Sequence, residues 1–301
     1  MAGTQDWMSA LQGNVKLSRL TIPGTHESGA IYGYASPPNN TFAYIYCQEK
    51  DLASQLSMGI RCIDIRCRQI SDTFQIHHGP YYMNLEYGSG VRDVCINFLK
   101  ANPTECILMM VKPEYDNPGN TKTFTEVFDA YLKEREDFFY LGDSIPTLNQ
   151  VRGKIVLVRR YSINDTVSAN HANHGLDPSG WGDNGVFSLS SQDSSGATVK
   201  FEIQDKYSVD QEDVFNKLTR IENLMDKAGA DSGDDTFYIN LTSGVGATSA
   251  PGTIAKAIHP DFYNALGKTF ANRLGILMID YPDDPQVQRI IGKNFGSGWP
   301  V

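Results

Sequence analysis

The sequence contains no apolar run long enough to cross a membrane. Its longest runs, such as residues 107–111, have the length of a β-strand, whereas a membrane-spanning helix needs about 20 apolar residues. Residues 1–6 also lack the basic stretch and the apolar stretch of a secretory signal peptide. We therefore expect no integral membrane protein, and either a cytoplasmic chain or the mature form of a secreted one.

Basic residues are scarce relative to acidic ones. The 301 residues include 26 Lys and Arg against 35 Asp and Glu, which gives a formal net charge of −9. Nucleic acids and anionic membrane surfaces attract proteins through basic patches. The charge balance therefore argues against a nucleic-acid partner and against adhesion to membranes through bulk charge.

Cysteine is sparse and shows no metal-binding spacing. The five cysteines are an odd number, so at least one lies outside any intrachain disulfide, and no CxxC pair occurs. Nucleotide-binding motifs of the GxGxxG and GxxxxGK types are absent as well, which removes the usual dinucleotide and NTPase interpretations. We interpret the cysteines as buried thiols and leave a disulfide of Cys47 open. They are Cys47, Cys62, Cys67, Cys95 and Cys106.

Strand-like and helix-like segments alternate along the chain. Several strand-like runs are almost continuously apolar, which is typical of a parallel sheet covered on both faces. Eight such runs with helices between them favour an α/β fold, a single TIM-type (β/α) barrel over residues 1–301. The second and third runs are separated only by a short turn, so the barrel should be irregular. The predicted strands are 16–23, 61–67, 74–78, 106–112, 154–161, 199–205, 236–242 and 276–281, and the predicted helices are 50–59, 91–101, 121–135, 211–227 and 253–272.

Ionisable side chains stand where seven of the predicted strands end. Barrel enzymes carry their chemistry at the carboxyl ends of the strands, so a barrel would bring these residues to one mouth. Any single one could be a solvated residue leaving a strand, but seven strand ends with ionisable side chains favour a site. The residues are His26, Arg66, His78, Lys112, Arg160, Asp205 with Tyr207, and Asp280.

These residue types suit an anionic phosphodiester. Histidine gives or takes a proton near neutral pH, and Arg or Lys stabilises charge on a phosphorus transition state without a metal. Asp280 is suited to orient one imidazole, as the carboxylate of a catalytic triad does. The sequence therefore predicts in-line phosphoryl transfer in which one histidine activates a hydroxyl and the other protonates the leaving oxygen. The site is expected to be a cationic pocket inside an acidic protein.

Three short motifs carry a family resemblance. Residues 23–30 read PGTHESGA, residues 59–66 read GIRCIDIR and residues 77–80 read HHGP. In this order and spacing they resemble the X domain of phosphatidylinositol-specific phospholipase C, and most closely the small single-domain bacterial enzymes. Later segments continue the resemblance, which runs from about residue 14 to residue 282: residues 154–161, 204–207 and 238–243, and Asp280.

The resemblance implies a distorted barrel that cleaves phosphatidylinositol to diacylglycerol and a cyclic inositol phosphate, without a cofactor. His26 matches the general base that takes a proton from the inositol 2-hydroxyl, with Asp280 as its partner. His78 matches the general acid that protonates the diacylglycerol oxygen. The resemblance also implies an inositol pocket, three of whose members hydrogen-bond the sugar while a tyrosine ring stacks on it: Lys112, Arg160, Asp205 and Tyr207.

Three further residues of the motifs bear on metal use and geometry. Arg66 matches the arginine that holds the phosphate where the eukaryotic enzymes hold calcium. Calcium needs several oxygen ligands, so a permanent cation there implies turnover with no metal. Asp64, in the same strand motif, is expected to orient its neighbours. Glu27 stands where the bacterial enzymes usually carry aspartate; the longer carboxylate can still reach His78, with a different geometry.

Aromatic residues gather between residues 32 and 46, after the first predicted strand. Tyr34, Phe42 and Tyr44 are candidates for shallow insertion into a membrane interface, and the alternative is that several pack beneath the loop. The expected partner is phosphatidylinositol in membranes, through transient contact, with no stable protein partner evident. The resemblance implies a secreted, extracellular bacterial enzyme, which could act on free phosphatidylinositol, on glycosylphosphatidylinositol anchors, or on both.

Some residues receive no function from the sequence. His77 should point to the strand face opposite its neighbour and pack as a structural residue. The tryptophans are scattered, and packing in the core or at the rim explains them: Trp7, Trp181 and Trp299.

Two other functions remain as alternatives. A glycerophosphodiester phosphodiesterase is also a barrel with two histidines, but it needs acidic metal ligands where Arg66 stands. A non-catalytic inositol-lipid or lectin-like binding module would not require both proton-transfer groups, His26 and His78.

Overall fold

The computed structural model of the chain describes residues 3–33, 42–163 and 174–298. Its strands are β1 Ile22–Thr25, β2 Cys62–Ile70, β3 Thr73–His78, β4 Tyr81–Glu86, β5 Ile107–Pro113, β6 Phe139–Tyr140, β7 Ile155–Arg159, β8 Gly185–Gln192, β9 Thr198–Asp205, β10 Thr236–Leu241 and β11 Ile276–Ile279. Its α-helices are α1 Phe42–Ile45, α2 Leu52–Met58, α3 Asp93–Ala101, α4 Phe124–Lys133, α5 Leu148–Val151, α6 Val214–Ala230, α7 Pro251–Lys268 and α8 Asp284–Gly292.

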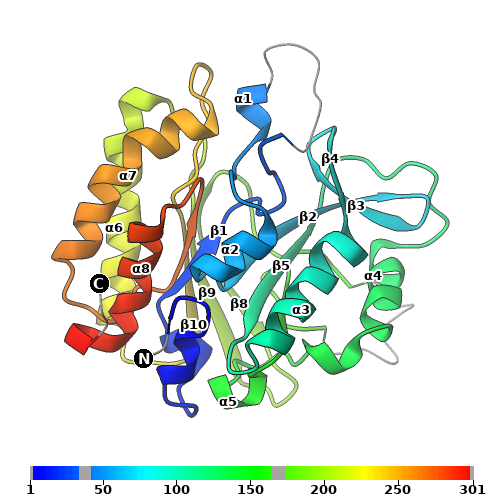
Figure 1. The fold of residues 1–301 in the computed structure, drawn as a ribbon, viewed down its shortest axis with the longest axis horizontal. Coiled ribbons are helices and arrows are strands. Elements are labelled where there is room, and N and C mark those ends of the chain that lie inside the picture. Colours follow the sequence, from blue (N-terminus) through cyan, green and yellow to red (C-terminus); the bar gives the residue numbers. More distant parts are fainter. Residues whose placement is uncertain (1–2, 34–41, 164–173, 299–301) are drawn as a thin grey trace.

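The strands form one curled sheet with helices around its outside (Figure 1). The order along the sheet is β6-β7-β5-β2-β1-β11-β10-β9-β8, and every neighbouring pair is parallel except β8 with β9. Among the described strands, β6 and β8 end the sheet without pairing with each other, so the barrel is open at that point. The prediction of an irregular TIM-type α/β barrel is confirmed.

The irregularity lies where the sequence predicted it. β3 pairs antiparallel with β2 and with β4, so this hairpin leaves the barrel path instead of crossing over through a helix. The short turn at Ser71 and Asp72 makes the antiparallel return, and both residues have positive φ angles of 50° and 59°. The hairpin therefore carries His78 to the mouth of the barrel from outside the ring of parallel strands.

Burial follows the apolar pattern of the sequence. Residues 107–111 of β5 are all buried, as expected of a strand covered on both faces. The helix α2 begins at the Asp51 cap, whose side chain accepts from Ser54 N at 2.8 Å. It ends at Gly59, where φ is 118°, a conformation that favours glycine and turns the chain into β2.

Two groups of predictions need correction. The predicted strand 16–23 is wrong over residues 16–21, because Leu17–Arg19 form a 3₁₀ turn and the strand begins only at Ile22. In this turn the Ser18 hydroxyl donates to the Asp234 carbonyl, and the Leu17 side chain is buried. The turn therefore covers the end of the barrel at which β1 begins. Six elements were not predicted from the sequence: β4, β6, β8, α1, α5 and α8.

Two simpler expectations are tested directly. All five cysteines are buried free thiols, so Cys47 forms no disulfide. In the part of the chain that is described, no helix combines the length and apolar character that crossing a bilayer requires.

Candidate active site

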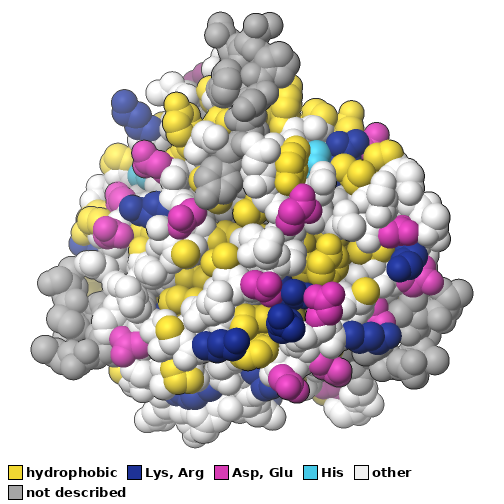
Figure 2. Space-filling model, turned by 45° about the vertical axis from the view of Figure 1, so that its right-hand side comes forward, with side chains coloured by type: hydrophobic (Ala, Val, Ile, Leu, Met, Phe, Trp, Pro, Cys, Tyr) yellow, Lys and Arg dark blue, Asp and Glu magenta, His cyan; other side chains and the backbone are white. Residues whose placement is uncertain are grey.

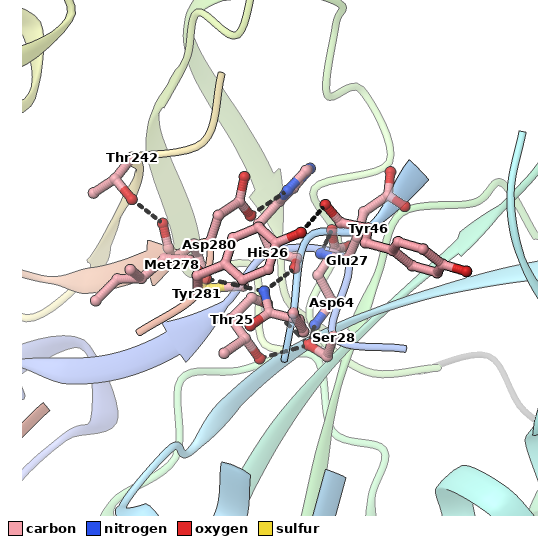
Figure 3. A network of polar contacts seen from close by, with 12 residues as sticks. Thr25, His26, Glu27, Ser28, Tyr46, Asp64, Thr242, Met278, Asp280 and Tyr281 are labelled. Carbon is pink, nitrogen blue, oxygen red and sulfur yellow. Dashed lines mark hydrogen bonds and ion pairs between the residues drawn. The ribbon is translucent and has the colours of Figure 1, made fainter. Parts of the chain in front are cut away.

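The carboxyl ends of the parallel strands surround a cleft of about 390 Å³. The residues that the sequence placed at the strand ends all line it, so seven separate segments converge on one mouth as predicted. Figure 3 shows the part of this site around His26, Glu27 and Asp280. The cleft is lined by His26, Glu27, Tyr44, Cys47, Arg66, His78, Gly79, Lys112, Glu114, Arg160, Gly182, Asp183, Asp205, Tyr207, Ser243, Gly244, Val245, Pro251 and Asp280.

His26 and Asp280 form a hydrogen-bonded pair at the ends of neighbouring strands. Thr25 of β1 is in register with Ile279 of β11, so the next residue of each strand projects from the same end of the sheet. His26 Nδ1 lies 2.9 Å from Asp280 Oδ1 (Figure 3). With its proton on Nδ1 toward the carboxylate, the neutral ring keeps Nε2 as the atom that can accept a proton.

The charge of Asp280 also sets the protonation of this histidine. Burial alone would lower the pKa of His26, but the charge and hydrogen bond of Asp280 outweigh that effect and raise the pKa above its ordinary value of 6.5. The carboxylate is itself almost completely buried, and its Oδ2 has no hydrogen-bond partner among the described residues. Asp280 thus increases the affinity of the His26 imidazole for a proton.

His78 stands across the cleft with a different set of partners. Its Nδ1 lies 3.0 Å from the Ile45 carbonyl oxygen and 3.2 Å from Glu27 Oε2. Because both neighbours of Nδ1 are hydrogen-bond acceptors, Nδ1 carries a proton, and Nε2 is the atom left for other partners. Burial would raise the pKa of the neighbouring Glu27, but the charges of His78 and Arg66 outweigh that effect and lower it.

Glu27 is held in a strained backbone conformation. Its φ is 40°, a left-handed value that costs a residue with a side chain about 1–3 kcal/mol. The backbone N–H of Glu27 donates to Asp64 Oδ2 at 3.1 Å, and the next N–H, of Ser28, donates to the Asp64 carbonyl at 2.9 Å. The strained turn at the end of β1 is thereby fastened to β2, and it directs the Glu27 carboxylate between His78 and Arg66.

Arg66 is surrounded by carboxylates. Asp64 accepts from its Nε and Nη2 at 2.9–3.1 Å, and its Nη1 lies 3.4 Å from Glu27 Oε1 and 3.6 Å from Glu114 Oε2. Burial would raise the pKa of Asp64, but the charges of Arg66 and Arg160 hold it well below its usual range. Asp64 lies beneath the cleft rather than in its lining, and it fixes the guanidinium that does face the cleft.

Lys112 and Arg160 complete a group of cations beside Arg66. Repulsion from Arg66, together with burial, lowers the pKa of Lys112. Burial and the Arg66 charge lower the pKa of Arg160 to about 10. Three mutually repelling cations in a small volume form a site that an anion would stabilise.

Trp181 and Asp183 belong to the site, although the sequence analysis gave them no function. Trp181 Nε1 donates to Asp205 Oδ2 at 2.9 Å, and its ring lies under the Arg160 guanidinium, 3.8 Å from ring centroid to Cζ. Asp183 accepts from the Tyr207 hydroxyl at 2.7 Å. Trp181 packs against the hydrophobic core as expected, and these contacts connect it to the site as well. Both residues precede β8, and no strand-end pattern marks them in the sequence.

Two other lining residues were also missed. Glu114 follows Lys112 by two residues, so alternation along β5 would have placed it on the same face. Cys47 enters from the segment after α1, where nothing in the sequence connects it to a strand end.

The prediction of a cationic pocket needs correction. The lining contains three Lys or Arg side chains, Arg66, Lys112 and Arg160, but five Asp or Glu side chains. The acidic members are Glu27, Glu114, Asp183, Asp205 and Asp280. The cations lie together with carboxylates around them. The lining therefore has a cationic group within it but no net positive charge.

The protein is an α/β barrel with paired imidazole and carboxylate groups at its strand ends, and comparison with known proteins names its family. Residues 38–161 match the family described as phosphatidylinositol-specific phospholipase C, X domain. A 1-phosphatidylinositol phosphodiesterase of Staphylococcus aureus is 33% identical over 308 aligned positions, 96% of this chain and 94% of the relative. One of Listeria monocytogenes is 29% identical and covers 97% of this chain and 85% of its own length.

Solved structures agree with these relatives. A structure of the S. aureus phosphatidylinositol-specific phospholipase C has a TM-score of 0.82 at 29% identity, over 96% of this chain and 97% of the other. The L. monocytogenes enzyme has a TM-score of 0.77 at 28% identity, over 97% of this chain and 99% of the other. The chain belongs to the bacterial phosphatidylinositol-specific phospholipase C family.

Proposed function

We propose that this protein cleaves phosphatidylinositol to diacylglycerol and inositol 1,2-cyclic phosphate, without a metal, by general base and general acid catalysis between His26 and His78. One observation carries the proposal: two imidazoles, each beside a buried carboxylate, line the same cleft as a buried guanidinium. Binding alone needs no such pair of proton-transfer groups, which disfavours a lipid-binding module.

His26 acts as the general base. Nε2 of the neutral ring takes the proton of the inositol 2-hydroxyl as that oxygen attacks phosphorus. Asp280, 2.9 Å from Nδ1, stabilises the imidazolium that forms. The raised pKa of His26 increases its strength as a base, at the cost of a larger protonated fraction in acid.

His78 acts as the general acid. The bond between phosphorus and the diacylglycerol oxygen breaks as the P–O bond to the inositol 2-oxygen forms, and the proton on His78 Nε2 passes to the leaving oxygen. Glu27 Oε2, 3.2 Å from Nδ1, forms an ion pair with the protonated ring before transfer. The products are an alcohol and a five-membered cyclic phosphodiester, so protons and charge balance without water.

Arg66 stabilises the phosphate charge. Its guanidinium is positioned by Asp64 through three contacts of 2.9–3.1 Å and lines the same cleft as the two histidines. A fixed cation of this kind replaces the charge stabilisation that a bound metal would supply. The same residue disfavours the glycerophosphodiester phosphodiesterase alternative, which needs metal-binding carboxylates at that position.

We assign the inositol ring to the wall formed by Lys112, Arg160, Asp205 and Tyr207. Asp205 and Arg160 are fixed by Trp181, and Tyr207 by Asp183, so these three groups are oriented before a ligand enters. A polyhydroxylated ring suits such a wall of alternating donors and acceptors, which supports a headgroup-specific site. Free phosphatidylinositol and a glycosylated form share this ring.

Exposed aromatic side chains around the mouth support transient contact with a membrane interface. Tyr44 is partly exposed and also lines the cleft, and Phe215, in the first turn of α6, is 76% exposed. Tyr32 and Tyr115, which follow β1 and β5, are exposed at the same end. Of the earlier candidates, Tyr34 and the side chain of Phe42 lie outside the described residues.

The charge distribution agrees with a transient mode of binding. Figure 2 shows acidic and basic side chains interspersed on one face of the molecule, with no broad basic patch there. We propose that recognition of one headgroup at a time, and not bulk attraction to anionic lipid, brings this single-domain enzyme to the bilayer. Its expected extracellular location and lack of a nucleic-acid or stable protein partner follow the family resemblance and the acidic charge.

The decisive experiment is a headgroup-specific product assay. Vesicles of phosphatidylinositol and of phosphatidylcholine are incubated with the protein, with and without EDTA, and cyclic inositol phosphate is detected by phosphorus NMR. We expect the cyclic product from phosphatidylinositol only, at the same rate with EDTA. Phosphatidic acid and free inositol as products would favour the phosphodiesterase alternative. Loss of activity in EDTA would refute metal independence, and unchanged turnover in His26→Ala or His78→Ala would refute the mechanism.

A further inference from the structure

Cys47 is a thiol placed between the two proton-transfer pairs. Its sulfur and ligand atoms of His26 and Asp280 all lie within 4.8 Å of one another, and so do its sulfur and ligand atoms of Glu27 and His78. The side chain lines the cleft, although the residue is fully buried. The mechanism proposed above makes no use of this thiol.

The segment that carries Cys47 is fixed on both sides. Gln48 Nε2 donates to the His26 carbonyl at 2.7 Å and to the Ile279 carbonyl at 3.1 Å, which joins this segment to the ends of β1 and β11. The Tyr281 N–H donates to the Cys47 carbonyl at 3.0 Å. These hydrogen bonds fix the backbone of the segment, so the Cys47 sulfur is held beside His26 and Asp280.

We propose that Cys47, His26 and Asp280 form an inhibitory site for a thiophilic divalent cation of the zinc type. A thiolate, an imidazole and a carboxylate are the ligands that zinc takes in proteins, and tetrahedral bonds of about 2.0–2.3 Å place such atoms about 3.6 Å apart. The observed spread of up to 4.8 Å closes to that value through side-chain movements of roughly 1 Å.

A second observation points to the same three residues. Asp280 Oδ2 is buried without a hydrogen-bond partner among the described residues, so a carboxylate lone pair at this place is unused by the protein. The trio around Glu27 is the weaker choice, because the Arg66 guanidinium lies 3.4 Å from that carboxylate and would repel a metal ion.

Charge and protons balance at the proposed site. The thiol of Cys47 loses its proton to solvent when the metal binds, and His26 ligates as the neutral imidazole. One thiolate and one carboxylate then neutralise the two positive charges of the ion. The soft sulfur ligand selects zinc-like ions over calcium and magnesium, which prefer oxygen. The bound ion removes the base from catalysis, an effect that rests on the proposed function.

Direct binding tests the site without reference to turnover. The reduced, metal-free protein is titrated with Co²⁺ and then with Zn²⁺, and the thiolate-to-cobalt charge-transfer absorption is recorded with calorimetric affinities. We expect one Co²⁺ per chain with that absorption, displaced by Zn²⁺. Cys47→Ala should abolish the band and weaken Zn²⁺ binding about 10- to 100-fold, while Cys95→Ala, a buried thiol of α3 outside the cluster, should change neither.

Absence of the band in the parent protein, or its survival in Cys47→Ala, would overturn the proposal. If Cys47→Ala does not fold, Asp280→Asn keeps the thiol and should still weaken Zn²⁺ binding, so unchanged affinity in that variant also overturns it. A second arm measures turnover of phosphatidylinositol. We expect Zn²⁺ to inhibit the parent protein and EDTA to restore its activity. Residual activity of Cys47→Ala should be less sensitive to Zn²⁺ than the activity of Cys95→Ala. Binding without any basal turnover would refute the proposed function and leave the metal site standing.

Discussion

The carboxylate of Glu27 reaches Nδ1 of His78 at 3.2 Å, although the two residues belong to strands that do not pair with each other. The strained φ of 40° at Glu27 aims the side chain across the cleft, and the extra methylene relative to aspartate spans the remaining distance. The same carboxylate lies 3.4 Å from Arg66. One side chain thus connects the group expected to donate the proton with the group expected to hold the phosphate.

Replacing this carboxylate should separate its charge from its length. We expect Glu27→Gln to lower kcat on the order of 100-fold, because the charged form of His78 loses its anionic partner, and Glu27→Asp to lower it only about tenfold. Steady-state kinetics on a soluble substrate measure both. Glu114→Gln is the matched control, since Glu114 also contacts Arg66, but its other oxygen accepts from the Gly79 N–H instead of pairing with the His78 ring. An equal loss there would contradict a specific role of Glu27.

The pH profile should report the charge of Asp280. The base must be unprotonated to act, so kcat/KM falls as the pH drops through the pKa of His26, which Asp280 raises above 6.5. In Asp280→Asn the raising effect is gone while burial still lowers the pKa, so the acid limb should move to lower pH as the maximal rate falls. An acid limb at the same pH in both proteins would show that His26 does not titrate there.

Trp181 should affect substrate affinity more than the chemical step. Trp181→Phe keeps a ring beneath Arg160 but removes the N–H that Asp205 accepts, and we expect KM to rise about tenfold with little change in kcat. Trp181→Ala, which loses the cation–π contact as well, should raise it further. A fall in kcat at constant KM would place Trp181 in catalysis instead. Thermal unfolding distinguishes either effect from loss of the fold.

The aromatic rim should matter only at an interface. We expect Phe215→Ser to reduce binding to phosphatidylinositol vesicles, measured by sedimentation, and to leave hydrolysis of a soluble substrate unchanged. Phe270→Ser is a matched control, because Phe270 is fully exposed but follows α7 at the opposite end of the barrel. Equal effects of the two substitutions on vesicle binding would remove the rim from membrane contact.

The strand ends could be predicted from sequence because the signal is local. An apolar run such as residues 107–111 defines a buried strand, and the polar residue that follows it leaves the sheet at a known end. The pairing of His26 with Asp280 then follows from the barrel, which brings the first and last strands together. The fold class and the residues around the cleft were therefore accessible without coordinates.

Other parts of the site could not be predicted, because tertiary contacts alone create them. Trp181 enters from a segment before an antiparallel strand, and its role exists only where Arg160 and Asp205 come together. Cys47 is set beside the base by hydrogen bonds of its neighbours, which no spacing encodes. The charge of the cleft was misjudged because carboxylates that offset the cations were not counted. Glu114 lies two residues beyond Lys112, where the predicted strand ended, and Asp183 follows no apolar run that would mark it.

The parallel pairing of β1 with β11 has a consequence during protein synthesis. The ribosome releases His26 early and Asp280 some 254 positions later, so a growing chain carries the imidazole long before its carboxylate partner exists. Contacts of such large sequence separation form late in folding, because closing the intervening loop costs entropy that only the finished barrel repays. Nascent chains that end before β11 therefore lack Asp280, and we expect lipid cleavage to begin only when β11 has joined β1 to β10.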